Sequence, residues 1–140
     1  MSGAETVVRR RVEWSDTDAA GIHHHTAIAR FAEAAEAEHM RARGLDAYFP
    51  VAPRVRFEVD YQAPLLFGQE VTVVLAVERV GEASMTFVFE VWGEAFGERE
   101  RVRSAVGRYV TVHVPGLHGG EARSAPWPEG WAQRVVDPAP

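Results

Sequence analysis

The sequence contains no cysteine, no lysine and no asparagine, and all 15 of its basic residues are arginine. Without cysteine the chain has neither disulfide bonds nor a thiolate nucleophile, and this absence favours no particular compartment. Scarcity of the thermolabile residues Asn and Cys is typical of heat-adapted hosts. Such usage is also typical of GC-rich genomes, so composition leaves both origins open.

An excess of positive charge and a long apolar segment are also absent. The 20 acidic residues outnumber the 15 basic ones and give a net charge of -5, so the chain has no general positive field for nucleic-acid phosphates. No run approaches the roughly 18 apolar residues of a membrane span, and residues 1–6 lack the apolar core of a signal peptide. We therefore expect a cytoplasmic protein with no nucleic-acid partner and no membrane insertion.

The length of 140 residues is enough for one hydrophobic core and too short for two independently stable domains. We expect a single domain over residues 1–140, with its core at about residues 7–114 and a tail at residues 115–140 that is rich in Gly and Pro. Within that tail, the pattern of residues 128–134 predicts a short terminal helix.

One long helix is predicted over residues 26–43. This segment has no Gly or Pro, contains seven alanines, and repeats apolar side chains at three- and four-residue spacing. Its length corresponds to about five turns. Thr26 is placed to cap the N-terminus, and Gly44 is placed to end the helix just past its C-cap. The many small side chains would let this helix lie close against a sheet.

Strand patterns occupy most of the remaining sequence. The clearest is residues 54–61, where charged and apolar residues alternate, as in a strand with one buried and one solvated face. Turns are predicted at Gly68, Gly81 and Gly97. The five predicted strands are residues 7–14, 54–61, 71–80, 84–92 and 99–114.

The order of one strand, a long helix and four strands predicts an α+β domain. This is the hot-dog fold, in which a five-stranded antiparallel sheet wraps one long central helix. We expect the last four strands to form an antiparallel meander. A single helix covers only one face of such a sheet, and the last strand would be an exposed edge in a monomer. We therefore expect a homodimer or homotetramer whose sheets join edge to edge.

Chemically active side chains concentrate in residues 16–25, DTDAAGIHHH, at the predicted turn from the first strand to the helix. Two carboxylates, a flexible glycine and three imidazoles lie where a fold can place a base beside the anion-stabilising N-terminus of a helix. Neighbouring side chains in an extended turn point apart, whereas compact histidine metal sites use spacings such as i, i+4. We therefore predict no metal site.

Residues 12–22 (VEWSDTDAAGI), 31–35 (FAEAA) and 43–45 (RGL) resemble the 4-hydroxybenzoyl-CoA thioesterase group of hot-dog proteins, which includes the acyl-CoA thioesterases associated with Tol-Pal. Residues 59–69 (VDYQAPLLFGQ) look like the second-strand motif of the same group. The resemblance spans roughly residues 7–114. It implies a thioesterase that hydrolyses an acyl-CoA substrate to a free acid and CoA and requires no cofactor.

The resemblance also assigns roles within the loop. In this group the carboxylate just before the x-x-Gly-Ile sequence is catalytic, and Asp18 matches it. Asp16 matches the other motif acid, which is expected to shape the loop. His25 falls at the family's histidine, while His24 replaces its usual tyrosine and Ile28 replaces an aromatic residue. Because of these departures, no known member's acyl preference is carried over.

Thioester hydrolysis needs a base or nucleophile near the carbonyl carbon and hydrogen-bond donors for the oxygen that becomes negative. The helix start near His25 can supply free backbone N–H groups and the positive end of the helix dipole. Gly21 gives the loop the freedom to bring Asp18 back toward these donors. Asp18 can act as a nucleophile or as a general base, and His25 can orient the thioester or protonate the departing thiol. The sequence leaves these alternatives open.

Further residues are expected to contact the substrate. Gly21, Ile22, His24 and Thr26 flank the catalytic pair along the chain. Glu33, about two turns into the helix, faces either the substrate pocket or solvent, and the two interpretations have equal weight. Tyr61 ends the second strand beside the predicted site, where it also has a structural role.

Arginines near the last strand are candidates for the CoA phosphates. Arg99, Arg101 and Arg103 recur with period two, so they would line one strand face and act as bidentate donors. A solvated face with no ligand is the alternative. Arg54 and Arg56 are weaker candidates.

Two other functions are compatible with the fold. A hot-dog dehydratase or hydratase is disfavoured, because those enzymes resemble patterns with His-Phe-Pro-Gly or Asp-x-Asn-Pro-x-His, and neither occurs here. A noncatalytic hot-dog module that binds acyl-CoA or another hydrophobic ligand, or that serves in assembly, would keep the groove without hydrolysis. The presence of Asp18 argues against this module.

Overall fold

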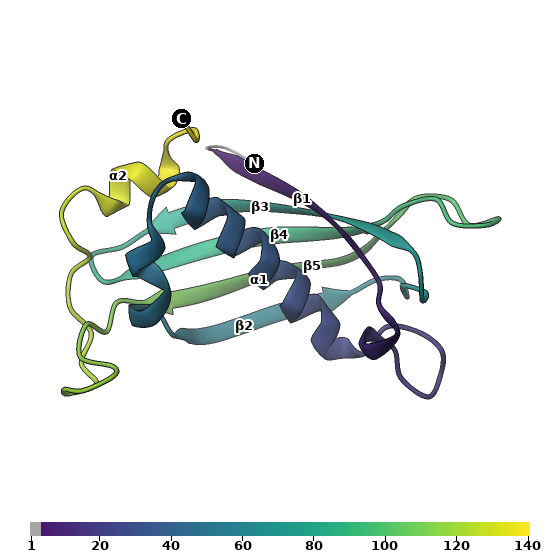
Figure 1. The fold of residues 1–140 in the computed structure, drawn as a ribbon, viewed down its shortest axis with the longest axis horizontal. Coiled ribbons are helices and arrows are strands. Elements are labelled where there is room, and N and C mark those ends of the chain that lie inside the picture. The colour runs from purple at the N-terminus through teal and green to yellow at the C-terminus, as the bar shows by residue number, and fades with distance from the viewer. Residues whose placement is uncertain (1–3) are drawn as a thin grey trace.

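The computed structural model describes residues 4–140, so residues 1–3 of the predicted domain lie outside the described part of the chain. One five-stranded antiparallel sheet curves around the long helix α1, which lies across one face of it (Figure 1). The predicted hot-dog arrangement, an α+β domain with one long helix and five strands, is confirmed. The elements in chain order are β1 (Glu5–Arg11), the 3-10 helix η1 (Trp14–Asp16), α1 (His25–Ala42), the 3-10 helix η2 (Asp46–Val51), β2 (Arg54–Tyr61), β3 (Glu70–Val80), β4 (Ser84–Gly93), β5 (Val102–Val112) and α2 (Trp131–Val136).

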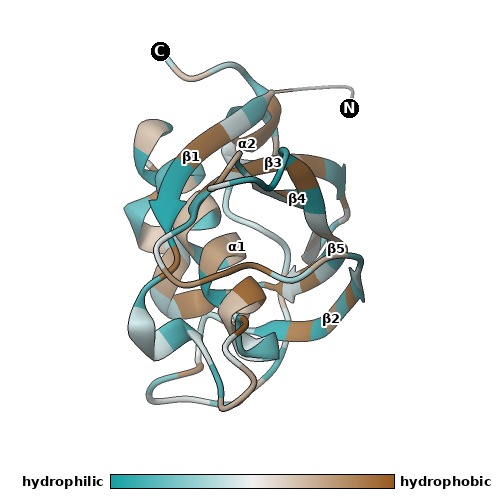
Figure 2. Ribbon diagram, turned by 90° about the vertical axis from the view of Figure 1, so that its right-hand side faces the viewer, coloured by the Kyte–Doolittle hydropathy of each residue, from teal (hydrophilic) through white to brown (hydrophobic). Residues whose placement is uncertain are grey.

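The strand order in the sheet is β1-β3-β4-β5-β2. The expected four-strand meander is therefore wrong for its first member: β3, β4 and β5 follow one another, whereas β2 pairs with β5 at the far edge. The last strand is consequently an interior strand and not the exposed edge that was predicted. The alternation along β2 (Figure 2) identifies a half-buried strand but not its neighbour, because the neighbour depends on where α1 and η2 deliver the chain.

Two strand ends differ from the predicted ones by three residues, and the other ends agree within two residues. β1 ends at Arg11 because the N–H of Glu13 donates to the Asp16 carboxylate and starts η1. β5 begins at Val102 and not at Arg99, because Arg99 pairs with Phe96 across the preceding turn. The start of the predicted last strand is therefore a turn.

Helix α1 begins one residue before the predicted start and is capped by His24 and not by Thr26. The Nδ1 atom of His24 accepts the backbone N–H of Thr26 at 3.2 Å, a role that Ser, Thr, Asp and Asn fill more often. At the other end Gly44 adopts a φ of +67°, and its N–H and that of Leu45 bond to carbonyls of the last turn. These two bonds form a Schellman motif, so the predicted role of Gly44 is confirmed.

The core fills the space between α1 and the concave face of the sheet. Ile28, Phe31, Ala32 and Ala35 of α1 are each 0% exposed, and the two alanines let the helix approach the sheet closely. Burial of this apolar surface is the main source of stability for such a domain. The sheet residues that pack against the helix include Val73, Leu75, Phe87, Phe89 and Tyr109.

The C-terminal segment extends this core beyond the predicted limit at residue 114. Trp127 and Val135 are buried in the same cluster, and α2 starts three residues later than the predicted terminal helix and ends two residues later than it. The buried ring of His39 lies 2.8 Å, through Nε2, from the carbonyl oxygen of Val135, which ties α2 to α1. None of the helices formed by residues 4–140 has both the length and the apolar character that a membrane crossing requires.

Candidate active site

The loop between β1 and α1 is held to the helix by Asp16. This carboxylate is 5% exposed and accepts two hydrogen bonds from Arg30 of α1, at 2.9 Å from Nε to Oδ1 and at 2.5 Å from Nη2 to Oδ2. Its Oδ2 also accepts the N–H of Glu13 at 2.7 Å, and its carbonyl accepts the N–H of His24 at 2.5 Å. A buried carboxylate requires such partners. Asp16 therefore fixes the loop and the start of the helix in relation to each other.

Asp18 lies at the exposed tip of this loop, where the chain reverses. Its N–H donates to the Ile22 carbonyl at 3.0 Å, and its own carbonyl accepts the N–H of Gly21 at 3.0 Å. Gly21 has a φ of +81°, which residues with a side chain rarely adopt. The Oδ1 atom of Asp18 accepts the N–H of Ala20 at 2.8 Å, whereas Oδ2 has no donor within residues 4–140. The carboxylate is thus oriented through one oxygen and has the other free.

A cavity of about 440 Å³ lies beside Asp18. Its walls come from two segments that are far apart in the sequence, the loop with the start of α1 and the end of β2 with the turn after it. The hydroxyl of Tyr61 joins the two segments by donating to the His25 carbonyl at 3.1 Å. The lining residues are Asp18, Ile22, His23, His25, Tyr61, Gln62, Ala63 and Pro64.

The start of α1 offers one free backbone donor and not several. The N–H of Thr26 bonds to the His24 ring, and the N–H of Ala27 bonds to the His24 carbonyl at 2.8 Å. Within the described residues, the N–H of His25 has no acceptor. Because His25 lines the cavity, this single donor and the dipole of α1 make the helix start a place for a negatively charged oxygen.

The predicted substrate residues of the loop divide into two groups. Ile22, like Tyr61, lines the cavity, whereas Gly21, His24 and Thr26 are not among its lining residues. Gly21 forms the turn, and the Nδ1 atom of His24 lies 2.7 Å from the Thr26 hydroxyl within the helix cap. In the described part of the chain, no group of three or more His, Cys, Asp or Glu residues is arranged to hold a metal ion.

The buried imidazole of the cavity belongs to His23, which was not among the predicted site residues. His23 is 7% exposed, and its Nδ1 accepts the N–H of Leu65 at 2.9 Å. Burial lowers the pKa of His23, and the negative charge of Asp18 opposes that shift. Alternation in an extended segment could have identified it, because residue 23 must face away from its two neighbours. The resemblance pointed instead to His25, whose ring is exposed and stacks on that of His24.

The three arginines do not share one strand face, because Arg99 and Arg101 lie before β5. Two of them nevertheless reach the cavity wall: Arg99 donates to the Pro64 carbonyl at 2.9 Å, and Arg103 donates to the Gln62 side chain at 2.9 Å. Arg101 is instead paired with Glu94 at 2.7 Å.

Glu33 is separated from Asp18 and lines a second, smaller cavity of about 220 Å³ with Glu36, Tyr48 and Arg54. Its carboxylate lies 3.7 Å from Arg54, which also donates to the buried Glu36 at 2.6 Å. Burial raises the pKa of Glu36, and the Arg54 charge opposes that shift. Arg54 thus forms an ion pair with the buried Glu36, and Arg56 forms one with Glu58 on the surface.

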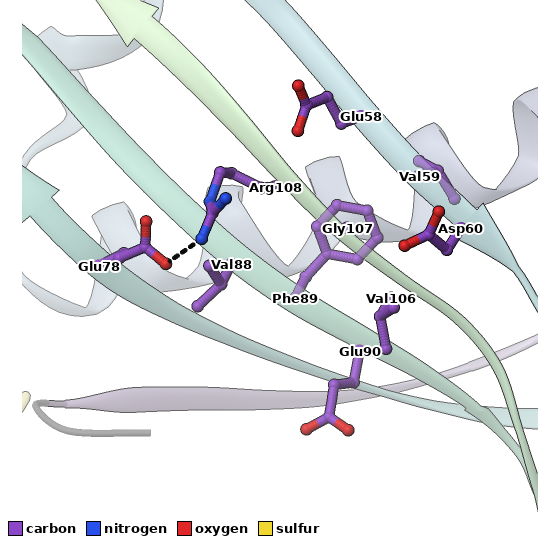
Figure 3. A pocket seen from close by; sticks show the side chains of 10 residues that line it. All are labelled: Glu58, Val59, Asp60, Glu78, Val88, Phe89, Glu90, Val106, Gly107 and Arg108. Atoms are coloured by element: carbon purple, nitrogen blue, oxygen red, sulfur yellow. Dashed lines mark hydrogen bonds and ion pairs between the residues drawn. The ribbon is translucent and has the colours of Figure 1, made fainter.

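A larger hollow of about 600 Å³ lies on the outer face of the sheet, away from α1 (Figure 3). Valines and charged side chains of β2–β5 line it, and its Glu78 and Arg108 form an ion pair at 2.7 Å. It contains no residue of the 16–25 loop and no helix N-terminus. The cavity beside Asp18 is smaller, but it combines a free carboxylate oxygen with an unpaired backbone donor, so we identify it as the candidate active site.

Comparison with protein families matches residues 20–95 to the family described as the thioesterase superfamily. The match includes α1 and the cavity wall at the end of β2, and it starts two residues after Asp18. A protein of Aquifex aeolicus (strain VF5), named as a candidate esterase, is 32% identical over 97 residues, which cover 63% of this chain and 73% of that protein.

Solved structures share the fold over nearly the whole chain. A thioesterase of Thermus thermophilus in complex with coenzyme A and Zn has a TM-score of 0.79 at 27% identity, covering 96% of this chain and 95% of its own. A 1,4-dihydroxy-2-naphthoyl-CoA thioesterase from Synechocystis has a TM-score of 0.79 at 19% identity, covering 96% and 97%. An aspartate-to-asparagine variant of 4-hydroxybenzoyl-CoA thioesterase with 4-hydroxybenzoyl-CoA has a TM-score of 0.82 at 14% identity, covering 94% and 98%.

Proposed function

The chain belongs to the thioesterase superfamily and is a thioester hydrolase, and from this premise we propose that it hydrolyses acyl-CoA thioesters in the cavity beside Asp18. One observation carries the proposal: the same cavity is lined by Asp18, whose carboxylate has a free oxygen, and by His25, whose backbone N–H at the helix start has no acceptor within residues 4–140. Fold relatives named for CoA thioesters, or solved with coenzyme A, support this substrate class.

In the general-base course, Asp18 takes a proton from a water molecule while the water oxygen bonds to the acyl carbon. The carbonyl π electrons move onto the oxygen, where the N–H of His25 and the dipole of α1 stabilise the charge. The C–S bond then breaks and its electron pair leaves with the CoA sulfur. The proton returns to the sulfur from Asp18, directly or through the His25 ring, and the products are a free acid and CoA.

In the nucleophilic course, a carboxylate oxygen of Asp18 bonds to the acyl carbon and the CoA thiolate leaves. The resulting mixed anhydride is then hydrolysed by water, which regenerates the carboxylate. Rapid-quench measurements address the difference between the two courses. The nucleophilic course predicts thiol release ahead of the acid when hydrolysis of the anhydride is slow, whereas the general-base course predicts simultaneous release.

For the CoA end of the substrate, we propose Arg99 and Arg103 as phosphate donors. Both already contact the cavity wall, and guanidinium groups bind phosphate oxygens in bidentate fashion. Arg103 is also paired with Glu90 at 3.2 Å, but Arg101 is paired more closely with Glu94, at 2.7 Å, and has no contact with the cavity wall among the described residues, so it is the weakest of the three. Ile22 and Tyr61 would contact the acyl group, because their side chains line the cavity.

A homodimer through the edge of β2 is the assembly that we propose. Within residues 4–140, β2 has a partner strand on one side, so its other side has unpaired N–H and C=O groups that another strand can bind. Val55 is 59% exposed and Tyr61 is 50% exposed along this strand, and Tyr61 also lines the cavity. A partner subunit here would add to the cavity wall, and sedimentation equilibrium would distinguish a dimer from a tetramer. The cytoplasmic location stays a prediction.

Thiol release tests the proposed activity. A panel of short, long and aromatic acyl-CoAs is incubated with the wild type and with Asp18→Asn, and free CoA is measured with a thiol reagent. Hydrolysis of at least one ester by the wild type and its loss in the variant are expected. Tight binding of an acyl-CoA by the wild type without thiol release would instead identify a noncatalytic ligand-binding module.

A further inference from the structure

The ring of His23 is fixed in one orientation and one tautomer. Its backbone N–H donates to the Leu65 carbonyl at 2.9 Å, and the N–H of Leu65 donates back to the ring at Nδ1, also at 2.9 Å. An atom that accepts an N–H carries no proton, so the proton of the neutral ring is assigned to Nε2. The ring also stacks near Tyr61, with centroids 6.3 Å apart.

The Nε2–H group of His23 has no acceptor among the described residues, although the side chain is nearly buried. His23 lines the same cavity as Asp18 and His25. Two residues that line the cavity therefore carry a hydrogen-bond donor without a partner within residues 4–140, the His23 ring and the backbone N–H of His25. The Nε2 atom keeps contact with solvent, so water or a ligand in the cavity can accept its N–H.

We infer that His23 donates its Nε2–H to the thioester oxygen and thus forms, with the N–H of His25, a two-donor oxyanion site. This inference rests on the proposed thioester hydrolysis. When the attacking oxygen bonds to the acyl carbon, the carbonyl electron pair moves onto the oxygen and both donors stabilise it. The electron pair on the oxygen then re-forms the C=O bond, the C–S bond breaks, and the sulfur leaves with the C–S bonding pair. His23 neither gains nor loses a proton in these steps.

An uncharged ring is required for this arrangement. Protonation of Nδ1 would place its new N–H against the N–H of Leu65, so the imidazolium would break the contact that aims the ring. The titratable groups around the ring are Asp18 and His24 on the loop, His25 on α1 and Tyr61 on β2. Burial, the largest cause of the lowered pKa of His23, keeps the ring neutral at pH 7.

Two substitutions separate the anchoring role of His23 from its donor role. In His23→Asn the side-chain oxygen can take the place of Nδ1 and accept the Leu65 N–H, but no donor reaches the position of Nε2. In His23→Gln the side-chain amide can present an N–H near the position of Nε2, while the Nδ1 acceptor is lost. His118→Asn, in the exposed C-terminal segment, is the matched control.

Steady-state kinetics and thermal unfolding are measured for all four proteins with the best acyl-CoA of the panel. We expect kcat of His23→Asn to fall about 100-fold with KM within about twofold, as for loss of an oxyanion donor. The unfolding temperature of this variant should stay close to that of the wild type. His23→Gln should recover at least about tenfold of the lost kcat despite its missing anchor, and His118→Asn should match the wild type.

The pH profile supplies a readout that an anchoring role would not move. Since the neutral ring is the active form, kcat of the wild type should decline with acid below pH 6.5, the unperturbed pKa of histidine, and this contribution should be missing in His23→Gln. Long-range ¹H–¹⁵N spectra of the histidine rings should assign the proton of His23 to Nε2.

Three results would overturn the inference. The first is a near-normal kcat in His23→Asn. If Asp18→Asn is inactive at the same time, the proposed function is retained and only the role of His23 is refuted. Equal losses of kcat in His23→Asn and His23→Gln, together with lowered unfolding temperatures, would make His23 an anchor only. An absence of hydrolysis in the wild type with every ester would refute the proposed function and this inference with it.

Discussion

Replacing Asp16 by Asn should unfold the protein more easily, and the size of the effect follows from three contacts. The two carboxylate oxygens of Asp16 accept Arg30 at 2.9 and 2.5 Å and the N–H of Glu13 at 2.7 Å. An amide has one oxygen, so its NH₂ group would face the guanidinium, donor against donor, in either orientation, and in one of them it would also face the Glu13 N–H. Breaking a buried ion pair destabilises by about 3–5 kcal/mol. The Arg30 side chain is 48% exposed, so water can solvate it once the pair is broken. We therefore expect the free energy of unfolding to decrease by about 2–3 kcal/mol.

For a chain of this length, that loss corresponds to a decrease of about 6–10 °C in the unfolding temperature. Scanning calorimetry at one fixed protein concentration is the assay, because assembly would otherwise shift the value. Asp18→Asn is the matched control. The Asp18 side chain accepts one hydrogen bond, from the N–H of Ala20 to Oδ1, and Asn retains this oxygen. The free energy of unfolding should therefore change by no more than about 0.5 kcal/mol. An unfolding temperature of Asp16→Asn equal to that of this control would refute the division of roles between the two acids.

Three further variants probe a buried histidine, the proposed phosphate site and the turn at Gly21. Burial lowers the pKa of His39 below 6.5, so its contribution to the free energy of unfolding is fully present above pH 6.5 and is lost as pH falls through the lowered pKa. The unfolding temperature should therefore drop with acid in the wild type and drop less in His39→Gln. Equal slopes of unfolding temperature against pH in the two proteins would exclude His39 as the cause. Arg103→Ala should raise KM for acyl-CoA about 5- to 10-fold with kcat little changed, whereas Arg123→Ala should alter neither; an unchanged KM in the first variant would remove Arg103 from the phosphate site. Gly21→Ala forces a φ of +81° on a residue with a Cβ and should destabilise by about 1–2 kcal/mol, seen as a lower midpoint in urea; an unchanged midpoint would mean that the turn rearranges.

Local signals in the sequence predicted the elements well. The unbroken stretch before Gly44 and the alternation in residues 54–61 placed α1 within one residue at each end and β2 at its observed bounds. Both signals depend on neighbouring side chains and on the backbone freedom of one glycine. The pairing of β2 with β5 depends on a contact between segments that are far apart in the sequence, and no local pattern contains it.

The residues that line the candidate cavity agree with the sequence prediction only in part. Asp18, Ile22, His25 and Tyr61 do line one cavity, because the loop and the helix start adjoin each other in the chain and Tyr61 ends the strand beside them. Alternation separates the side chain of His23 from that of His24, but the burial of His23 depends on the turn that contains Leu65, which is far away in the sequence.

The turnover of Asp18→Asn decides whether the Asp18 carboxylate is required for hydrolysis. The substitution keeps the shape and the Ala20 contact and removes the charge that the proposed chemistry requires. We predict a kcat for thiol release at least about 100-fold below that of the wild type, with substrate affinity little changed. A variant that turns over acyl-CoA at nearly the wild-type rate would contradict this prediction and move the chemistry away from this cavity.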